Sequence, residues 1–199
     1  WASDWVGLAN FEALVHSSDF WNVMKNTLVI SLTKILIGFP IPILLAILLN
    51  DIKSMRFKRV TQTFLYLPHF LSWVVIGGIM LNLFSPVFGL AGEVFRTLGI
   101  EPVNIMAKKG SIFWVVIFSD VWKEAGWSTI VFLAALTQVD ESLYEAAKMD
   151  GANKFKQMLH ITLPCISSIV IVMLILRIGK VMNAGFEPVS YTHLRAHET

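Results

Sequence analysis

The chain has 199 residues, of which 55% are hydrophobic and 15% are charged, and its formal net charge is +2. A soluble domain usually carries about 25% charged residues and a disordered chain is poor in aromatic residues, so this composition argues against a globular enzyme and excludes disorder. The single cysteine, Cys165, excludes an internal disulfide framework and a cysteine-based zinc cluster, and the small charge gives no footprint for nucleic acid. We therefore expect an integral membrane protein.

The N-terminal part, residues 1–27, is predicted to be an external amphipathic segment whose aromatic-rich stretch lies on the membrane interface. Beyond it, several stretches are long and apolar enough to cross a bilayer, which takes about 20 residues. Their apolar residues run continuously instead of alternating, so they predict helices and not barrel strands. The predicted membrane spans are residues 28–49, 64–84, 111–136 and 161–183.

The first span contains Gly38, Pro40 and Pro42, which predict a kink, because each proline removes a backbone hydrogen bond. Lys and Arg are more numerous in the loops 50–63 and 137–160 than in the segments on the other side. By the positive-inside rule, these two loops are predicted to be cytoplasmic.

Charged residues inside the predicted spans are a second signal, because each costs about 2.5–3.5 kcal/mol at the centre of a membrane helix. They must pair, face water or reach an interface, and a pair between Asp120 or Glu124 and Arg177 is one possibility. Our hypothesis is that a translocation cavity is lined by charges and aromatic faces; the alternatives are structural pairing for the charges and packing or interfacial roles for the tryptophans. The candidate residues are Asp120, Trp122, Lys123, Glu124, Trp127 and Arg177.

The loop 139–164 is longer than a connector between two spans needs to be. Asp140 or Ser142 is placed to cap a short helix, with Ser142 and Glu145 at the spacing of a capping box. Gly151 then permits a sharp turn. The predicted helix–glycine–helix elbow suggests a docking surface for a cytoplasmic partner.

The elbow resembles a known signature. Its residues match the pattern E-A-A-x3-G-x9-I-x-L-P of type-1 ABC importer permeases at Glu145, Ala146, Ala147, Gly151, Ile161, Leu163 and Pro164. The stretches 5–26, 26–42, 66–75 and 183–187 are similar to the permease branch that handles sugars and oligosaccharides with a lipoprotein binding component.

This resemblance implies the permease subunit of an ATP-driven sugar importer in the bacterial cytoplasmic membrane, with an all-α, multi-pass, six-helix fold of which the four spans are a fragment. It implies that the elbow, Asp150 included, couples to an ATP-binding subunit, and that this chain is not itself an enzyme. The implied partners are a second permease, two ATP-binding subunits holding ATP and Mg²⁺, an extracellular solute-binding lipoprotein and the lipid bilayer. No cofactor or metal is expected on this chain.

Three alternatives remain open from the sequence: a type-1 permease for peptides, amino acids or an anion, a secondary transporter, and a membrane-embedded enzyme. The elbow disfavours the second, and the lack of an acid–base or metal cluster disfavours the third. Residues 188–199 are polar and aperiodic and are similar to a translated sequencing adapter. We therefore expect the native permease domain to begin near residue 28, to run to about residue 187 and then to continue differently, with one further helix after it and another before Trp1.

Overall fold

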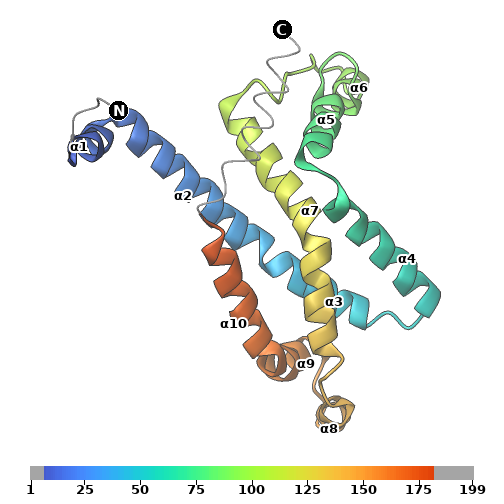
Figure 1. Ribbon diagram of the computed structural model, residues 1–199. Coiled ribbons are helices and arrows are strands. Elements are labelled where there is room, and N and C mark those ends of the chain that lie inside the picture. Colours follow the sequence, from blue (N-terminus) through green and yellow to red (C-terminus); the bar gives the residue numbers. More distant parts are fainter. Residues whose placement is uncertain (1–6, 182–199) are drawn as a thin grey trace.

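The computed structural model describes residues 7–181, and all of its regular elements are helices (Figure 1). They are α1 (Ala9–His16), α2 (Ser18–Gly38), α3 (Pro40–Asn50), α4 (Met55–Tyr66), the 3-10 helix η1 (Leu67–Phe70), α5 (Trp73–Phe84), α6 (Leu90–Thr97), α7 (Lys109–Leu136), α8 (Glu141–Met149), α9 (Lys154–Gln157), the π-helix η2 (Met158–Thr162) and α10 (Leu163–Gly179). This confirms the predicted all-helical fold.

The first membrane helix is longer than predicted. Residues Ser18–Asn50 form a 33-residue apolar helix, α2 and α3, that is interrupted only at Phe39. This helix begins inside the segment 1–27 that was predicted to be external, and only Ser17, which is extended, separates it from α1. The interruption at Phe39 lies where the kink was predicted, immediately before two prolines that lack a backbone N–H.

The second predicted span, 64–84, is not one straight helix. The chain bends by 105° between the helical stretch Met55–Phe70 and helix α5. Leu71, between them, is extended, with φ −77° and ψ 141°. The run of apolar residues conceals this break, which follows Pro68 and precedes a new helix start at Ser72, whose Oγ accepts a hydrogen bond from the Val75 N–H (3.3 Å).

Helix α7, the third predicted span, lies at the centre of the described structure and contacts α2, α3, α4, η1, α5 and α10. Two apolar clusters form on it: one with α5, around Ile76 and Val116, and one with α3 and α10, around Ala46 and Phe132. The charged turns of α7 lie between these clusters. Within residues 7–181, two helices are long and apolar enough to cross a membrane, or three with the bent pair, and α7 is not among them.

The last span, residues Lys154–Gly179, is 26 residues long. It begins earlier than the predicted Ile161, because α9 and the π-helix η2 continue without interruption into α10. Its predicted last residues, 182–183, and the suspected tail, 188–199, lie outside the described residues.

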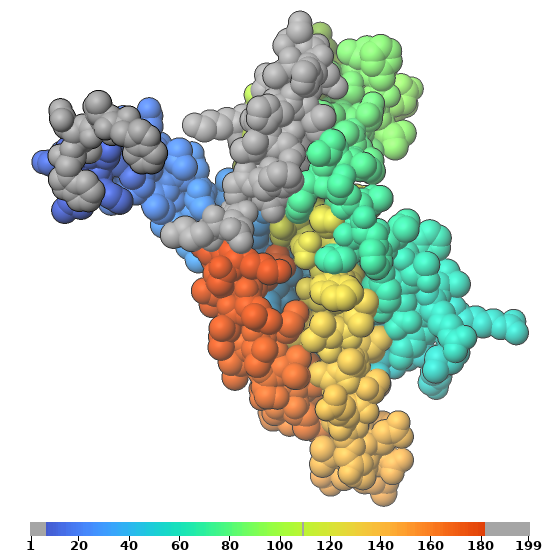
Figure 2. Space-filling model, viewed as in Figure 1, coloured from blue at the N-terminus to red at the C-terminus, as the bar shows by residue number. Residues whose placement is uncertain are grey.

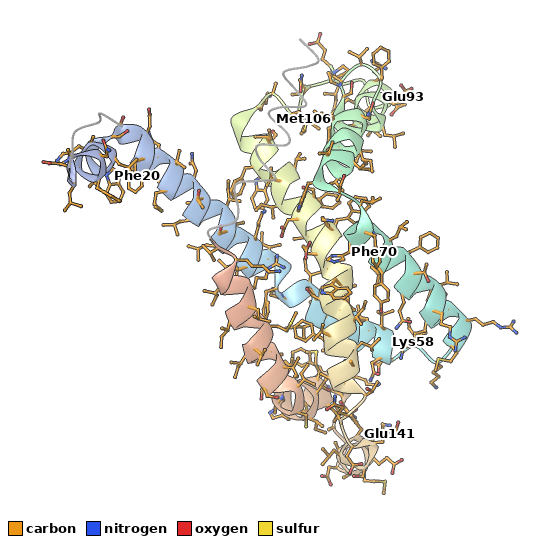
Figure 3. The ribbon with its side chains drawn as sticks, viewed as in Figure 1. Phe20, Lys58, Phe70, Glu93, Met106 and Glu141 are labelled. Atoms are coloured by element: carbon orange, nitrogen blue, oxygen red, sulfur yellow. The ribbon has the colours of Figure 1, made fainter. Side chains whose placement is uncertain are left out.

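The two loops that were predicted to share one side of the membrane lie at the same end of the molecule. Lys154 Nζ is 2.8 Å from Asp51 Oδ1, which joins the start of α9 to the end of α3. Figure 3 shows Lys58 and Glu141 at this end and Glu93 and Met106 at the other. Helix α8 forms a knob that projects beyond the rest of the described surface (Figure 2).

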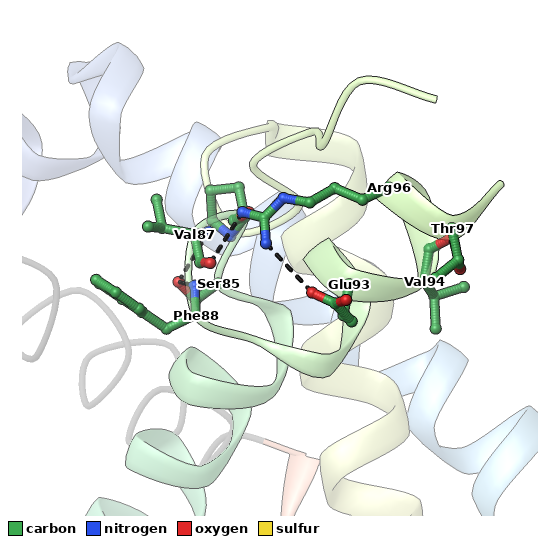
Figure 4. Close-up of polar contacts among 8 residues, drawn as sticks. Ser85, Val87, Phe88, Glu93, Val94, Arg96 and Thr97 are labelled. Carbon is green, nitrogen blue, oxygen red and sulfur yellow. Dashed lines mark hydrogen bonds and ion pairs between the residues drawn. The ribbon is translucent and has the colours of Figure 1, made fainter. Parts of the chain in front are cut away.

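At the opposite end, a short turn and α6 are held together by one arginine (Figure 4). Arg96 donates hydrogen bonds to the carbonyls of Pro86 (3.0 Å) and Val87 (2.9 Å) and to Glu93 Oε2 (3.3 Å). A Cβ on Gly89 would lie 2.4 Å from the Asn82 carbonyl oxygen, so this tight turn requires glycine.

Candidate functional site

The polar middle of the bundle is built around Asp120 of α7. Its Oδ2 accepts a hydrogen bond from Arg177 Nη2 of α10 (2.8 Å), and its Oδ1 lies 3.3 Å from Lys34 Nζ of α2. The side chains of Asp120 and Lys34 are less than a tenth exposed. The proposed pair between Asp120 and Arg177 is therefore present in the structure, and one carboxylate joins three helices.

A glycine makes room for this triad. Gly38 lies one turn after Lys34 on α2, and a Cβ there would come within 3.0 Å of Arg177 Nη2. Because glycine has no side chain at this point, the guanidinium can approach α2 closely and reach the carboxylate of Asp120.

Next to the triad is a cavity of about 370 Å³ between α2, α5, α7 and α10. Its charged lining residues are Lys34, Asp120, Glu124, Arg177 and Lys180. The aromatic lining residues are Phe39, Trp73, Trp127 and Phe132, and small and aliphatic residues complete the wall. The arrangement offers hydrogen-bonding groups beside flat apolar faces, the combination that orients a small polar ligand.

His69 of η1 packs against two of the lining residues, Trp127 and Glu124 of α7. Its ring stacks on Trp127, with centroids 5.0 Å apart and planes at 10°. Its Nδ1 is buried and has no hydrogen-bond partner within residues 7–181; Glu124 Oε1 is 3.7 Å away. No local pattern singles out His69, because its partners Glu124 and Trp127 lie more than fifty positions along the chain.

The structure thus gathers four of the six predicted pathway residues, Asp120, Glu124, Trp127 and Arg177, at one cavity. The lining does not include Lys123 or Trp122, which leave α7 in other directions. It adds Lys34, Trp73 and Lys180. From the sequence, Lys34 and Lys180 are recognisable only as charges and Trp73 only as an aromatic residue. Their position at the cavity depends on how their helices pack against α7, which no local pattern reveals.

The predicted coupling residues lie on the projecting elbow and the helix that follows it. Glu145, Ala146, Asp150, Gly151 and Pro164 are exposed, whereas Ala147, Ile161 and Leu163 are half-buried. Gly151 ends α8 with φ +76°, and the Ala152 N–H donates to the Ala147 carbonyl (2.8 Å), which is the Schellman arrangement.

The elbow is attached to the start of the last span by side chains. The Tyr144 hydroxyl lies 3.0 Å from Thr162 Oγ1 in the π-helix, and Gln157 Nε2 donates to the Ala152 carbonyl (2.8 Å). Ala146 and Gly151 of the motif therefore remain on the surface, while a tyrosine and a glutamine hold the elbow in position.

Asp140, and not Ser142, caps α8. Its Oδ1 accepts a hydrogen bond from the Ser142 N–H (2.9 Å), and this bond lowers the pKa of the Asp140 carboxyl. Because the pKa of this carboxyl is lower in the folded protein, the ionised group stabilises the fold at pH values above its ordinary pKa of 3.8, and this stabilisation is lost as the pH falls through the folded pKa.

We expect hydrogen exchange in residues 141–149, corrected for intrinsic rates, to accelerate on acidification. Asp140→Asn should retain the cap and lose this acid response; an equal response in that variant would contradict the assignment.

The left-handed backbone at Gly151 predicts a second effect. Gly151→Val places a β-branched residue in a conformation that costs L-residues roughly 1–2 kcal/mol, so unfolding of the detergent-solubilised protein should occur at lower temperature. Gly151→Asn should lose less, because asparagine tolerates this conformation. Equal losses in the two variants would show that backbone strain is not the cause.

Comparison with known proteins gives the chain a family. Residues 38–189 match the family described as binding-protein-dependent transport system inner membrane component. The chain is 46% identical over 187 residues to the polygalacturonan/rhamnogalacturonan transport system permease protein YteP of Bacillus subtilis (strain 168), over 94% of this chain and 58% of YteP. It is 42% identical over 189 residues to Protein LplB of the same organism, over 95% of this chain and 59% of LplB.

A solved structure agrees with this. The crystal structure of a bacterial ABC transporter involved in the import of the acidic polysaccharide alginate has a chain with a TM-score of 0.90 and 37% identity, over 94% of this chain and 66% of that one. The present chain therefore spans less than two thirds of the length of these relatives and has the fold of a fragment of a type-1 permease. The resemblance predicted from the elbow is confirmed: the chain belongs to the family of binding-protein-dependent transport system inner membrane components, multi-pass permeases of the cytoplasmic membrane.

Proposed function

We propose that this chain forms part of the translocation pathway of an ATP-driven importer for oligosaccharides. The observation that carries the proposal is the central cavity, where the ion-paired Asp120 and Arg177 lie beside the faces of Trp73 and Trp127. Sugar hydroxyls can exchange hydrogen bonds with such charged groups, and sugar rings can stack on the indoles. The relative YteP, which is named for transport of polygalacturonan and rhamnogalacturonan, supports this substrate class.

The elbow is the proposed contact with an ATP-binding subunit. Its exposed side chains include Met149, which is 89% exposed, beside Glu145 and Asp150. The small Ala146 allows a partner surface to approach α8 closely. In this proposal ATP and Mg²⁺ are held by two ATP-binding subunits, the chain pairs with a second permease, and an extracellular binding lipoprotein delivers the sugar. A related transporter was crystallised with an alginate pentasaccharide-bound periplasmic protein.

Within the sugars, we propose an acidic oligosaccharide. The described charged residues of the cavity are three cations, Lys34, Arg177 and Lys180, and two carboxylates, Asp120 and Glu124. Lys180 is exposed at the rim of the cavity, where it can meet a uronate carboxylate without giving up a buried partner. Such electrostatic complementarity favours anions over neutral analogues.

Uptake by the assembled transporter tests both parts of the proposal. Trp127→Ala should lower the uptake of a labelled oligogalacturonide, whereas Trp114→Ala, a matched change on the exposed outer face of α7, should not. Lys180→Gln should weaken uptake of the acidic sugar and spare a neutral oligosaccharide. Equal uptake by the Trp127 and Trp114 variants would contradict the cavity, and an equal effect of Lys180→Gln on both sugars would contradict the acidic substrate.

A further inference from the structure

Lys123 is a buried cation that the cavity does not use. It is 7% exposed and lies at the middle of α7, yet it points toward the break between η1 and α5. Its Nζ donates hydrogen bonds to the carbonyl oxygens of His69 (2.8 Å) and Leu71. The ammonium also lies 5.6 Å from the centroid of the Trp73 ring.

The break creates carbonyl groups that need a donor. The last carbonyls of any helix lack partners within it, and inside a membrane an unsatisfied backbone group costs several kcal/mol because water is absent. On the other side of the break, Ser72 already caps the start of α5 through the Val75 N–H. The ammonium of Lys123 supplies donors for the carbonyl side, and its positive charge suits the negative end of a helix.

We infer that Lys123 is a positioning residue that maintains the 105° break in the second span and thereby sets the aromatic wall of the cavity. The inference rests on the proposed function only where it concerns the wall; the role in the break stands on the contacts of Lys123 itself.

Two links connect the break to the cavity. Trp73, the first residue of α5, lines the cavity, and its ring centroid lies 5.6 Å from the Lys123 ammonium and 6.0 Å from the Lys34 ammonium. His69, whose carbonyl Lys123 binds, carries its ring against Trp127, another lining residue. If the second span straightened, the rings of Trp73 and His69 would be displaced. Lys123 would thus affect the cavity wall through the backbone that it binds.

Spin-label distances across the break test the inference directly. Cysteines replace the exposed Val60 on α4 and the exposed Asn82 on α5 in a Cys165→Ser background, within the assembled transporter. At 1.5 Å per residue a straight helix would separate these positions by about 33 Å, whereas a 105° bend brings them to roughly 20 Å. A wild-type distance near the longer value would overturn the inference before any variant is made.

Variants at Lys123 then assign the role. Lys123→Met should lengthen or broaden the distance distribution, and Lys123→Arg, which keeps cationic donors, should restore the short distance. Lys25→Met on α2, an exposed lysine far from the break, is the matched control and should leave the distance unchanged. A folded Lys123→Met protein with the wild-type distance would overturn the inference. If Lys123→Met fails to fold, a short distance in Lys123→Arg supports it, and a long one in that folded variant overturns it.

Transport kinetics separate this inference from the proposed function. Lys123→Met should raise the KM for the oligosaccharide by roughly tenfold, the scale expected for a displaced aromatic face, with a smaller change in kcat, and Lys123→Arg should restore it. A changed distance with unchanged KM would leave the role of Lys123 in the break intact and contradict the aromatic wall as a sugar contact.

Discussion

Replacing Asp120 by alanine is expected to lower the stability of the protein by about 3–5 kcal/mol, the cost of breaking a buried ion pair by removing one partner. Arg177 and Lys34 would lose the carboxylate that both contact, at 2.8 and 3.3 Å, in the middle of a membrane bundle. Thermal unfolding of the purified protein in detergent, together with its yield in the membrane, would measure the loss.

An exposed ion pair in the same chain provides the control. Asp51 lies 2.8 Å from Lys154, but the two side chains are 53% and 72% exposed. Asp51→Ala should therefore cost about 0–1 kcal/mol, as exposed pairs do. If Asp120→Ala lost no more than Asp51→Ala, the triad would not be a main link between α2, α7 and α10.

Replacing Gly126 by alanine is expected to separate α4 from α7. A Cβ on Gly126 would lie 1.9 Å from the carbonyl oxygen of Leu65, which is backbone and cannot rotate away. Overpacking typically costs about 1–3 kcal/mol and sometimes more, and here relief requires the movement of a whole helix. We expect a lower unfolding temperature and, because α4 leads into the break, a changed distance between labels on α4 and α7.

The matched change is Gly78→Ala on α5. A Cβ there would meet nothing within 4 Å, and alanine is the better helix former by roughly 0.5–1 kcal/mol. Gly78→Ala should therefore be neutral or slightly stabilising. A similar loss in both variants would show that helix propensity, and not the contact with Leu65, determines the effect at Gly126.

The sequence predicted elements well where a single local pattern decides them. Continuous apolar residues predicted α7 to within two residues of its start, and the capping residues around Asp140 predicted α8. The prediction of one continuous span failed at the break near Leu71, because a run of apolar residues has the same composition in a straight and in a bent helix. Ser72 was a weak signal for a new helix start.

The site shows the same limit. Opposite charges on separate spans were enough to suggest the pair of Asp120 and Arg177, because burial in a membrane demands pairing. Lys123 was grouped with the cavity charges, yet its partners are backbone carbonyls, which every residue possesses and no sequence distinguishes. Side-chain type therefore predicts that a buried charge needs a partner without predicting which atom supplies it.

The elbow is attached more strongly to α10 than to α3, and this difference determines which helix moves when α8 is displaced. The Tyr144–Thr162 contact attaches α8 to the continuous helix from Lys154 to Gly179, which includes α10. The exposed ion pair between Lys154, at the start of α9, and Asp51, at the end of α3, is a weak link, because exposed pairs contribute about 0–1 kcal/mol. We therefore expect a displacement of α8 to move α10, and with it Arg177, while α3 stays in place.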